Sequence, residues 1–168
     1  MTTANRITII RIILVPIFMI ALYINRYLAF AVYVVACLSD YLDGYIARKY
    51  NQISSFGKFM DPLADKMLVI SAMCYFCEVG RIPSWVVAIV CFREFAVSGL
   101  RMIAAEHQIV IPAGISGKVK TFSTMIALAI MLVFYVSWLD KLAWIVILLT
   151  TVYSGVEYFI NSKGVFSK

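Results

Sequence analysis

The chain has 168 residues, of which 63% are hydrophobic and only 14% are charged, and its formal net charge is +6. A soluble domain carries about 45–50% apolar and about 25% charged residues. Polar residues are therefore too few to cover a soluble globule, and lipid is the expected solvent for most of the surface. The length suits one domain, 1–168. The basic residues lie near the ends of apolar segments and form no nucleic-acid-binding motif, so they indicate contact with an anionic membrane surface and no nucleic acid partner.

Six apolar segments are each long enough to cross a bilayer as a helix, which takes about 20 residues. In chain order they are 7–24, 27–47, 59–79, 85–105, 120–138 and 142–160. The first continues past Pro16 with no small-residue cleavage site, so it is interpreted as a retained span and not as a signal peptide. The links are short, the longest being 107–117 and the last Asp140-Lys141. The sequence thus predicts an all-α integral membrane protein, a six-transmembrane-helix bundle in which successive helices are antiparallel.

Basic residues are distributed unevenly between the two sides of this predicted bundle. Ten lie on the side of the two termini and three lie on the other side. The first group is Arg6, Arg11, Arg48, Lys49, Lys58, Arg101, Lys118, Lys120, Lys163 and Lys168, and the second is Arg26, Arg81 and Lys141. Because Lys and Arg collect in cytoplasmic loops, both termini are predicted to be cytoplasmic. We expect a multi-pass protein of the cell inner (cytoplasmic) membrane.

Four carboxylates lie inside these apolar segments. Asp40, Asp43, Asp61 and Asp65 are four of the nine acidic residues in the chain. Charge within an apolar span is costly and marks a functional site by default. One pair precedes the inner end of the second helix and the other follows the inner start of the third, so both pairs are expected at similar depth. Since a helix turns about 100° per residue, each pair shares one helix face, and two adjacent helices can turn these faces together.

A cluster of four carboxylates cannot stay ionised without cations. Its ligands are all oxygens, which favours Mg²⁺ or Mn²⁺ over zinc. Four carboxylates can hold two such ions, the arrangement that clamps a phosphate during displacement, and we expect the active site to face the cytoplasm. Gly44 and Gly57 allow a ligand to approach the backbone, and Arg48 supplies donors for phosphate. The alternative is structural ion pairing of the acids with Arg48, Lys58 and Lys66.

These residues carry the resemblance to a known family. The fixed positions read Asp40-x-x-Asp43-Gly44-x-x-Ala47-Arg48 and, eight residues later, Gly57-x-x-x-Asp61-x-x-x-Asp65. This pattern resembles the signature of the CDP-alcohol phosphatidyltransferases, whose size and span count are also similar along the whole chain. The resemblance implies that a CDP-linked lipid such as CDP-diacylglycerol binds with its diphosphate on two metal ions. An alcohol then attacks the phosphorus that bears the lipid, and CMP leaves. Members of the family usually form homodimers, and a homodimer is expected here.

The resemblance also implies a role for each matching position. Asp40, Asp43, Asp61 and Asp65 match the metal ligands, and Asp65 also matches the catalytic general base, which takes the proton of the attacking hydroxyl. The positions that match CDP-lipid-binding residues are Asn5, Thr8, Gly44, Arg48, Ser54 and Gly57. Of these, Asn5 and Thr8 belong to a shorter element of the first helix that flanks the nucleotide.

Two later segments indicate the acceptor alcohol. Arg93 and Arg101 lie on roughly one face of the fourth helix, and Lys118 and Lys120 enter the fifth from its inner end. Several cations beside a metal centre favour an anionic second substrate, and glycerol 3-phosphate fits better than neutral inositol or zwitterionic serine. Both segments resemble those of the phosphatidylglycerophosphate synthases within the family. The candidate acceptor-phosphate residues are therefore these four, and Glu94 is expected to pair with Arg101 or with an adjacent helix.

Several alternatives remain open at this point. The positions of Arg101, Lys118 and Lys120 near helix ends are also explained by membrane topology alone. The same chemistry could use another acceptor, such as phosphatidylglycerol, inositol phosphate or serine. An intramembrane prenyltransferase also binds diphosphate through Asp-rich helices, although with more helices. A divalent-cation carrier could use the carboxylates as its ion path, although they lie at one end of the bundle and not at the midplane.

Overall fold

The computed structural model describes residues 3–49, 55–106 and 114–162; within these ranges, side chains are not described at 3–7, 40–49, 55–59, 61–62, 65 and 105–106. The described residues form helices and no strand, which confirms the predicted all-α fold. The six helices are α1 (Thr3–Ile24), α2 (Arg26–Lys49), α3 (Ser55–Glu78), α4 (Ser84–Glu106), α5 (Ile115–Val133) and α6 (Ser137–Asn161).

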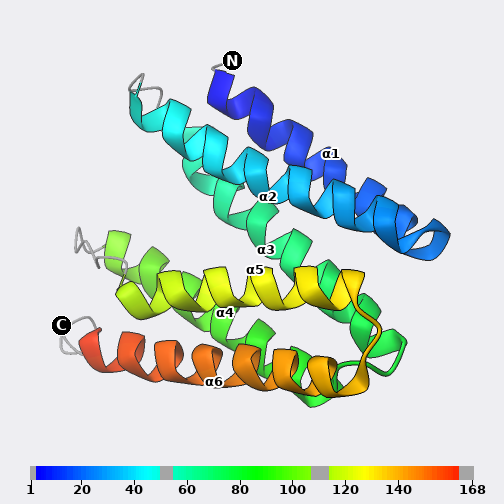
Figure 1. Ribbon diagram of the computed structural model, residues 1–168. Helices are drawn as coiled ribbons and strands as arrows, with labels where there is room; N and C mark the ends of the chain where they lie inside the picture. Colours follow the sequence, from blue (N-terminus) through cyan, green and yellow to red (C-terminus); the bar gives the residue numbers. More distant parts are fainter. Residues whose placement is uncertain (1–2, 50–54, 107–113, 163–168) are drawn as a thin grey trace.

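The helices run alternately in opposite directions. In Figure 1 the starts of α1, α3 and α5 and the ends of α2, α4 and α6 lie toward the left, and the three short turns lie toward the right. We call these the site end and the turn end of the bundle. α1 packs along α2, and α5 packs along α6, while α3 contacts α1, α2, α4 and α5. The short links therefore produce antiparallel neighbours, as expected.

Local sequence explains two of the connections at the turn end. The Asn25 side-chain oxygen accepts hydrogen bonds from the backbone N–H groups of Tyr27 (2.8 Å) and Leu28 (3.4 Å), and so caps the start of α2. Gly80 follows α3 with a φ of 72°, a left-handed conformation that glycine adopts without a steric penalty. These two residues fix where the chain reverses between α1 and α2 and between α3 and α4.

The predicted boundaries of the last two helices are wrong by about one turn. α5 starts at Ile115 and ends at Val133, and α6 starts at Ser137, so the connection lies at 134–136 and not at Asp140-Lys141. Asp140 instead lies in the first turn of α6, where the helix dipole favours a carboxylate. The polarity of Asp140 suggested a connection between helices, but its charge is neutralised by a partner within the fold.

The neutralising partner is Arg81, from the connection between α3 and α4. Its guanidinium forms a two-pronged ion pair with Asp140, at 2.8 Å and 2.5 Å. It also donates to the carbonyls of Met131 (2.8 Å) and Phe134 (2.7 Å) and lies over the ring of Tyr135, 4.1 Å from its centroid. Arg81 thus ties together the ends of three helices, a structural role that uses its full set of donors.

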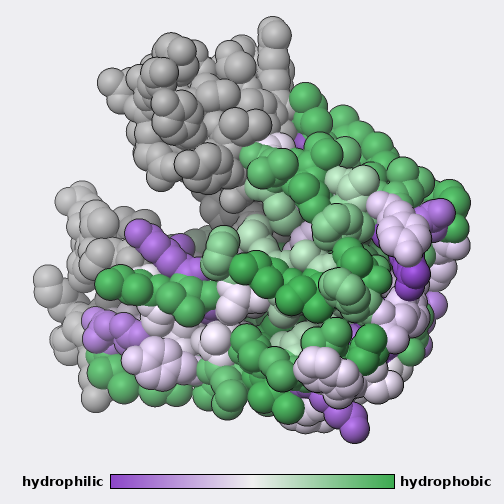
Figure 2. All heavy atoms as spheres, viewed as in Figure 1, coloured by the Kyte–Doolittle hydropathy of each residue, from purple (hydrophilic) through white to green (hydrophobic). Residues whose placement is uncertain are grey.

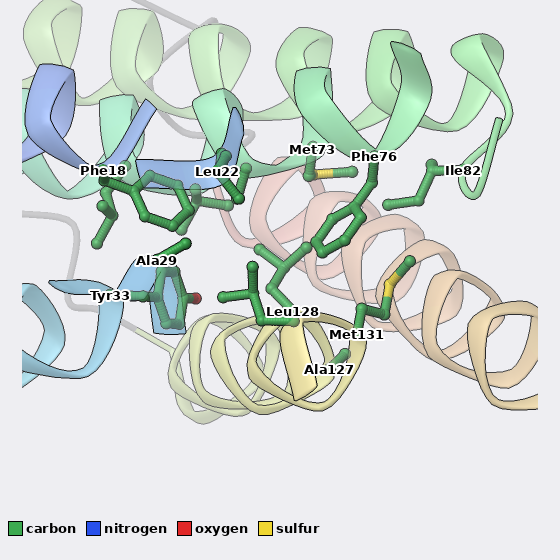
Figure 3. Close-up of a cluster of buried hydrophobic side chains, with 14 of the residues drawn as sticks. Phe18, Leu22, Ala29, Tyr33, Met73, Phe76, Ile82, Ala127, Leu128 and Met131 are labelled. Atoms are coloured by element: carbon green, nitrogen blue, oxygen red, sulfur yellow. The ribbon is translucent and has the colours of Figure 1, made fainter. Parts of the chain in front are cut away.

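The main apolar core contains residues of all six helices, most of them from α1, α2, α3 and α5. Figure 3 shows side chains from each of these four helices directed into one cluster, among them Phe18, Tyr33, Met73, Phe76 and Leu128. Alanines at 21, 29 and 36 are at most 2% exposed. Small residues of this kind allow helix backbones to approach closely in membrane proteins. The core therefore fixes α3 against the first two helices and against α5.

The outward surface is unusually apolar. Large hydrophobic residues are exposed along every helix, including Phe122 on α5 and Leu149 and Tyr153 on α6. In Figure 2 hydrophobic residues cover most of the coloured face over α5 and α6, and hydrophilic residues gather mainly near the helix ends. α5 and α6 are each long and apolar enough to cross a membrane, yet only 33% of the apolar stretch in each is buried. This exposure is opposite to that of a core helix in a soluble protein.

Candidate active site

The four aspartates of the signature lie on two helices that contact each other. Asp40 and Asp43 are near the end of α2, and Asp61 and Asp65 are in the first three turns of α3. Both stretches belong to the site end of the bundle. The aspartate side chains lie outside what the structure describes, as do those of Asn5 on α1 and Arg48 on α2. The surroundings of Gly44 and Gly57 and the whole of Ser54 also lie outside it. The expectation that the aspartates share metal ions therefore remains a prediction.

Beside this region, α1 holds two buried polar residues. Thr8, a predicted CDP-lipid-binding residue, is 1% exposed, and Arg11 is completely buried. Arg11 Nε donates to the hydroxyl of Ser39 at 3.3 Å, and Ser39 directly precedes Asp40. Sequence reasoning treated Arg11 only as a charge at the membrane surface. Its position three residues after Thr8, on the same helix face, was the signal that could have placed both against α2.

A second polar site is built around Glu94 of α4. One of its carboxylate oxygens, Oε1, accepts hydrogen bonds from Lys120 of α5 at 2.5 Å and from Arg93 at 3.0 Å. The other oxygen, Oε2, lies 3.9 Å from the ammonium group of Lys66 on α3. We call Lys66, Arg93, Lys120 and Glu94 the cation cluster. It joins α3, α4 and α5 and carries three positive charges against one negative charge.

The positions of these cations are fixed by additional contacts. Lys66 Nζ donates to the hydroxyl of Ser98 and, at 3.4 Å, to the backbone carbonyl of Glu94. Arg93 donates to the hydroxyl of Ser154 on α6 at 2.8 Å. Gly155, beside Ser154, leaves room for the arginine stem, because a Cβ added there would lie 3.2 Å from Arg93 Cγ. All four helices α3 to α6 thus contribute to the arrangement of the cluster.

The cluster borders a pocket with about 310 Å³ of free space, including the part that is open to the outside. Its polar lining consists of Lys66, Glu94, Lys120, Thr121 and Thr124, and its apolar lining of Val69 and Ile70. Lys66 follows the predicted general base Asp65 directly in the chain. A surplus of positive charge at a largely buried pocket favours the binding of an anion, above all one with several acceptor oxygens.

The predicted acceptor-phosphate residues have different surroundings. The structure brings Arg93 and Lys120 together at one carboxylate oxygen. Arg101 instead lies two turns further along α4, where it is exposed and donates to the hydroxyl of Tyr158 at 3.3 Å. Lys118 is exposed on α5. Of the two partners expected for Glu94, an adjacent helix is therefore correct and Arg101 is wrong, because Arg101 lies too far toward the site end.

Lys66 is the member of the cluster that sequence reasoning missed. It was considered only as a structural partner for the signature aspartates, whereas its ammonium group faces Glu94 and Ser98 on α4. A lysine in the fourth turn of an apolar helix was the available signal.

Metal ligands are absent from the described part of the site. No three His, Cys, Asp or Glu side chains come together within the described residues in a way that could hold a metal ion. The donor set that fits a hard divalent cation is the four signature aspartates, since it consists of carboxylates alone. The prediction of Mg²⁺ or Mn²⁺ rests on that chemistry.

The fold and the site together define a class of protein: an all-helical bundle, with helices able to cross a membrane, that holds a buried cluster of cations beside two aspartate-bearing helices. The model of the CDP-alcohol phosphatidyltransferase family matches residues 1–155, and the chain belongs to this family. It is therefore an enzyme of that class, and this membership decides against the prenyltransferase and the cation carrier.

Several curated relatives are similar over nearly the whole chain. A CDP-diacylglycerol–glycerol-3-phosphate 3-phosphatidyltransferase of Bacillus subtilis is 37% identical, with 92% of each chain covered. A protein of the same name from Rickettsia felis is 36% identical, with 96% of each covered. A probable phosphatidylglycerophosphate synthase of Mycobacterium tuberculosis is also 36% identical, over 92% of this chain and 78% of its own.

Proposed function

We propose that this enzyme transfers a phosphatidyl group from CDP-diacylglycerol to glycerol 3-phosphate, producing phosphatidylglycerophosphate and CMP in phospholipid biosynthesis. The observation that carries the choice of acceptor is the cation cluster. Lys66, Arg93 and Lys120 surround a single carboxylate, so two positive charges are left uncompensated in a largely buried place. A phosphate monoester carries about −1.5 to −2 at neutral pH, and its charge matches this surplus. The names of the relatives agree with this acceptor.

The reaction is a displacement at phosphorus. The acceptor hydroxyl oxygen forms a bond to the phosphorus that carries diacylglycerol, the bond from this phosphorus to the CMP oxygen breaks, and CMP leaves. Asp65 is proposed to accept the hydroxyl proton. Asp40, Asp43, Asp61 and Asp65 would hold two Mg²⁺ or Mn²⁺ ions, which would neutralise the diphosphate. Asn5, Thr8, Gly44, Arg48, Ser54 and Gly57 are the proposed contacts of the CDP-lipid.

The acceptor is proposed to bind on the side of Asp65 that faces away from the CDP-lipid. Lys66, Arg93 and Lys120 would hold its phosphate, and Arg101 and Lys118 would attract it from the site end. Because Lys66 is adjacent to Asp65 in the chain, the phosphate would lie close to the proposed base. Asp65 would accept the proton of the hydroxyl at the other end of the acceptor. Fixing the acceptor at its phosphate orients its hydroxyl for attack, a contribution that can exceed several powers of ten in rate.

The proposed setting is the cell inner membrane, with six spans, both termini in the cytoplasm and the site end facing the cytoplasm, where glycerol 3-phosphate is soluble. The exposed apolar surface of α5 and α6 supports contact with membrane lipid. A homodimer is proposed from the family resemblance.

The test is an acceptor panel with the purified enzyme in detergent micelles. CDP-diacylglycerol and Mg²⁺ or Mn²⁺ are supplied with glycerol 3-phosphate, inositol phosphate, serine or phosphatidylglycerol, and CMP release and lipid product are measured. Glycerol 3-phosphate is expected to be the preferred acceptor, and Asp65→Asn to be inactive with all four. Preference for inositol phosphate would keep the phosphate site but reject the assigned product, and preference for serine would reject both.

A further inference from the structure

Thr124 of α5 has a buried hydroxyl group that makes no hydrogen bond to the described residues. The residue is 1% exposed, and its Oγ1 has no hydrogen-bond partner among the described residues. Other threonine hydroxyls donate to a backbone carbonyl one turn earlier. On α5 the hydroxyl of Thr121 donates to Gly117 (3.1 Å), and on α6 that of Thr150 donates to Val146 (2.8 Å). A buried hydroxyl without a partner lowers stability, and one that lines a pocket is available to a bound molecule.

The location of this hydroxyl shows what kind of partner could reach it. Thr124 lines the pocket that Lys66, Glu94 and Lys120 also line. It lies four residues after Lys120, on the same face of α5 and about 6 Å further along the helix. A ligand whose phosphate is held by Lys66 and Lys120 has its adjacent carbon atoms within reach of Thr124 when it extends along α5 from that phosphate. Those carbons carry hydroxyl groups if the ligand is a polyol phosphate.

We propose that Thr124 recognises the non-reacting hydroxyl of the acceptor, the one on the carbon between the phosphate-bearing carbon and the reacting carbon. This inference rests on the proposed function and deepens it, because it assigns the site to phosphates of vicinal diols and not to phosphorylated alcohols in general. Thr124 is a specificity residue: it bonds to the part of the acceptor that takes no part in the displacement.

The chain offers a matched control for this assignment. Thr151 on α6 is also fully buried, with a hydroxyl that has no partner within the described part of the chain. It is not among the residues that line the pocket. Replacing either threonine with valine preserves the shape of the side chain and removes the hydroxyl. The two variants therefore impose the same chemical change inside and outside the pocket.

The experiment compares glycerol 3-phosphate with 3-hydroxypropyl phosphate, which lacks only the middle hydroxyl. Values of kcat/KM are measured with CDP-diacylglycerol in micelles for the wild type, Thr124→Val, Thr124→Ser and Thr151→Val. Thr124→Val is expected to lose about 5- to 10-fold with glycerol 3-phosphate, the effect of one neutral hydrogen bond, and less than about twofold with the analogue. Thr124→Ser, which keeps a hydroxyl, and Thr151→Val should keep the preference of the wild type.

Several outcomes would overturn the assignment of Thr124 as a specificity residue. An equal loss with both acceptors in Thr124→Val would overturn the assignment, because a structural defect lowers both rates alike. So would an unchanged preference for glycerol 3-phosphate. Loss of the preference in Thr124→Ser as well would contradict a role for the hydroxyl, and this variant serves if the valine variant fails to fold. A wild-type enzyme that ignores glycerol 3-phosphate would overturn the proposed function and this inference together, whereas the other results leave the proposed function intact.

Discussion

The substitution Glu94→Gln separates the charge of the cation cluster from its geometry. Glutamine keeps the length and shape of the side chain but removes the negative charge and offers a weaker acceptor. Glu94 accepts hydrogen bonds from Lys120 at 2.5 Å and Arg93 at 3.0 Å and lies 3.9 Å from Lys66. Without the carboxylate, three cations face each other with no anion among them, and their side chains lose the contact that fixes their directions.

The burial of the Glu94–Lys120 pair determines the expected effect of the substitution on the free energy of unfolding. Hydrogen bonds to charged groups contribute about 1.5–3 kcal/mol each, and breaking a buried ion pair costs about 3–5 kcal/mol. The side chains of Glu94 and Lys120 are only 11% and 5% exposed, so solvent screens this pair little. We expect Glu94→Gln to lower the free energy of unfolding by about 3 kcal/mol in detergent micelles.

Two effects on acceptor binding oppose each other. The added net positive charge would strengthen attraction for a phosphate, whereas loss of the fixed geometry would weaken it. Because binding depends on cations that are already in position, we expect the second effect to prevail. The KM for glycerol 3-phosphate should rise about tenfold, equivalent to about 1.4 kcal/mol. The KM for CDP-diacylglycerol should change less than about twofold, since the aspartate signature is untouched.

Initial rates of CMP release, with each substrate varied in turn, provide the measurement. Glu78→Gln is the matched control, because Glu78 lies at the turn end, where it is exposed and accepts a hydrogen bond from Tyr23 at 2.6 Å. It should leave both KM values unchanged and stability within about 0.5 kcal/mol. A fall in the KM for glycerol 3-phosphate in Glu94→Gln would show that net charge, and not the fixed geometry of the cations, determines binding.

Three further predictions address other parts of the molecule. Arg81→Lys loses the two-pronged ion pair and should lower the free energy of unfolding by about 2–4 kcal/mol; an unchanged melting temperature in micelles would contradict the structural role. Gly155→Ala places a methyl group 3.2 Å from Arg93 Cγ and should raise the KM for glycerol 3-phosphate about threefold, whereas Gly99→Ala, which meets nothing within 4 Å, should not. Asp65→Asn and EDTA treatment should each reduce CMP release by at least about 10²-fold without unfolding the protein; full activity after either would reject the proposed base or the metal requirement.

The helices were predictable because apolar stretches of about 20 residues separated by polar links leave little choice of architecture. The six helices were found in the predicted order, and the connections that contain Asn25 and Gly80 lie between the predicted segments. The boundary between α5 and α6 was not predictable in the same way. Asp140 has the polarity of a link residue, and its long-range ion pair with Arg81 adds to the favourable position in the first turn of α6.

The site was predictable where residues of one function are close in sequence. The signature aspartates follow a fixed spacing, and the family model confirms the class that this spacing indicates. The cation cluster is different, because Lys66, Glu94 and Lys120 come from three helices and their meeting depends on tertiary packing. Sequence patterns named Arg93 and Lys120 as cations near a phosphate, but they gave no indication that one buried carboxylate organises them.

We propose that this enzyme selects its acceptor by its phosphate group. Glycerol 3-phosphate and glycerol are compared as acceptors in the same micelles, with labelled CDP-diacylglycerol and saturating metal. We expect kcat/KM for glycerol 3-phosphate to exceed that for glycerol by at least about 10³-fold, because glycerol leaves the surplus positive charge of the cation cluster uncompensated. A kcat/KM for glycerol within about tenfold of that for glycerol 3-phosphate would show that the phosphate group does not determine the choice of acceptor.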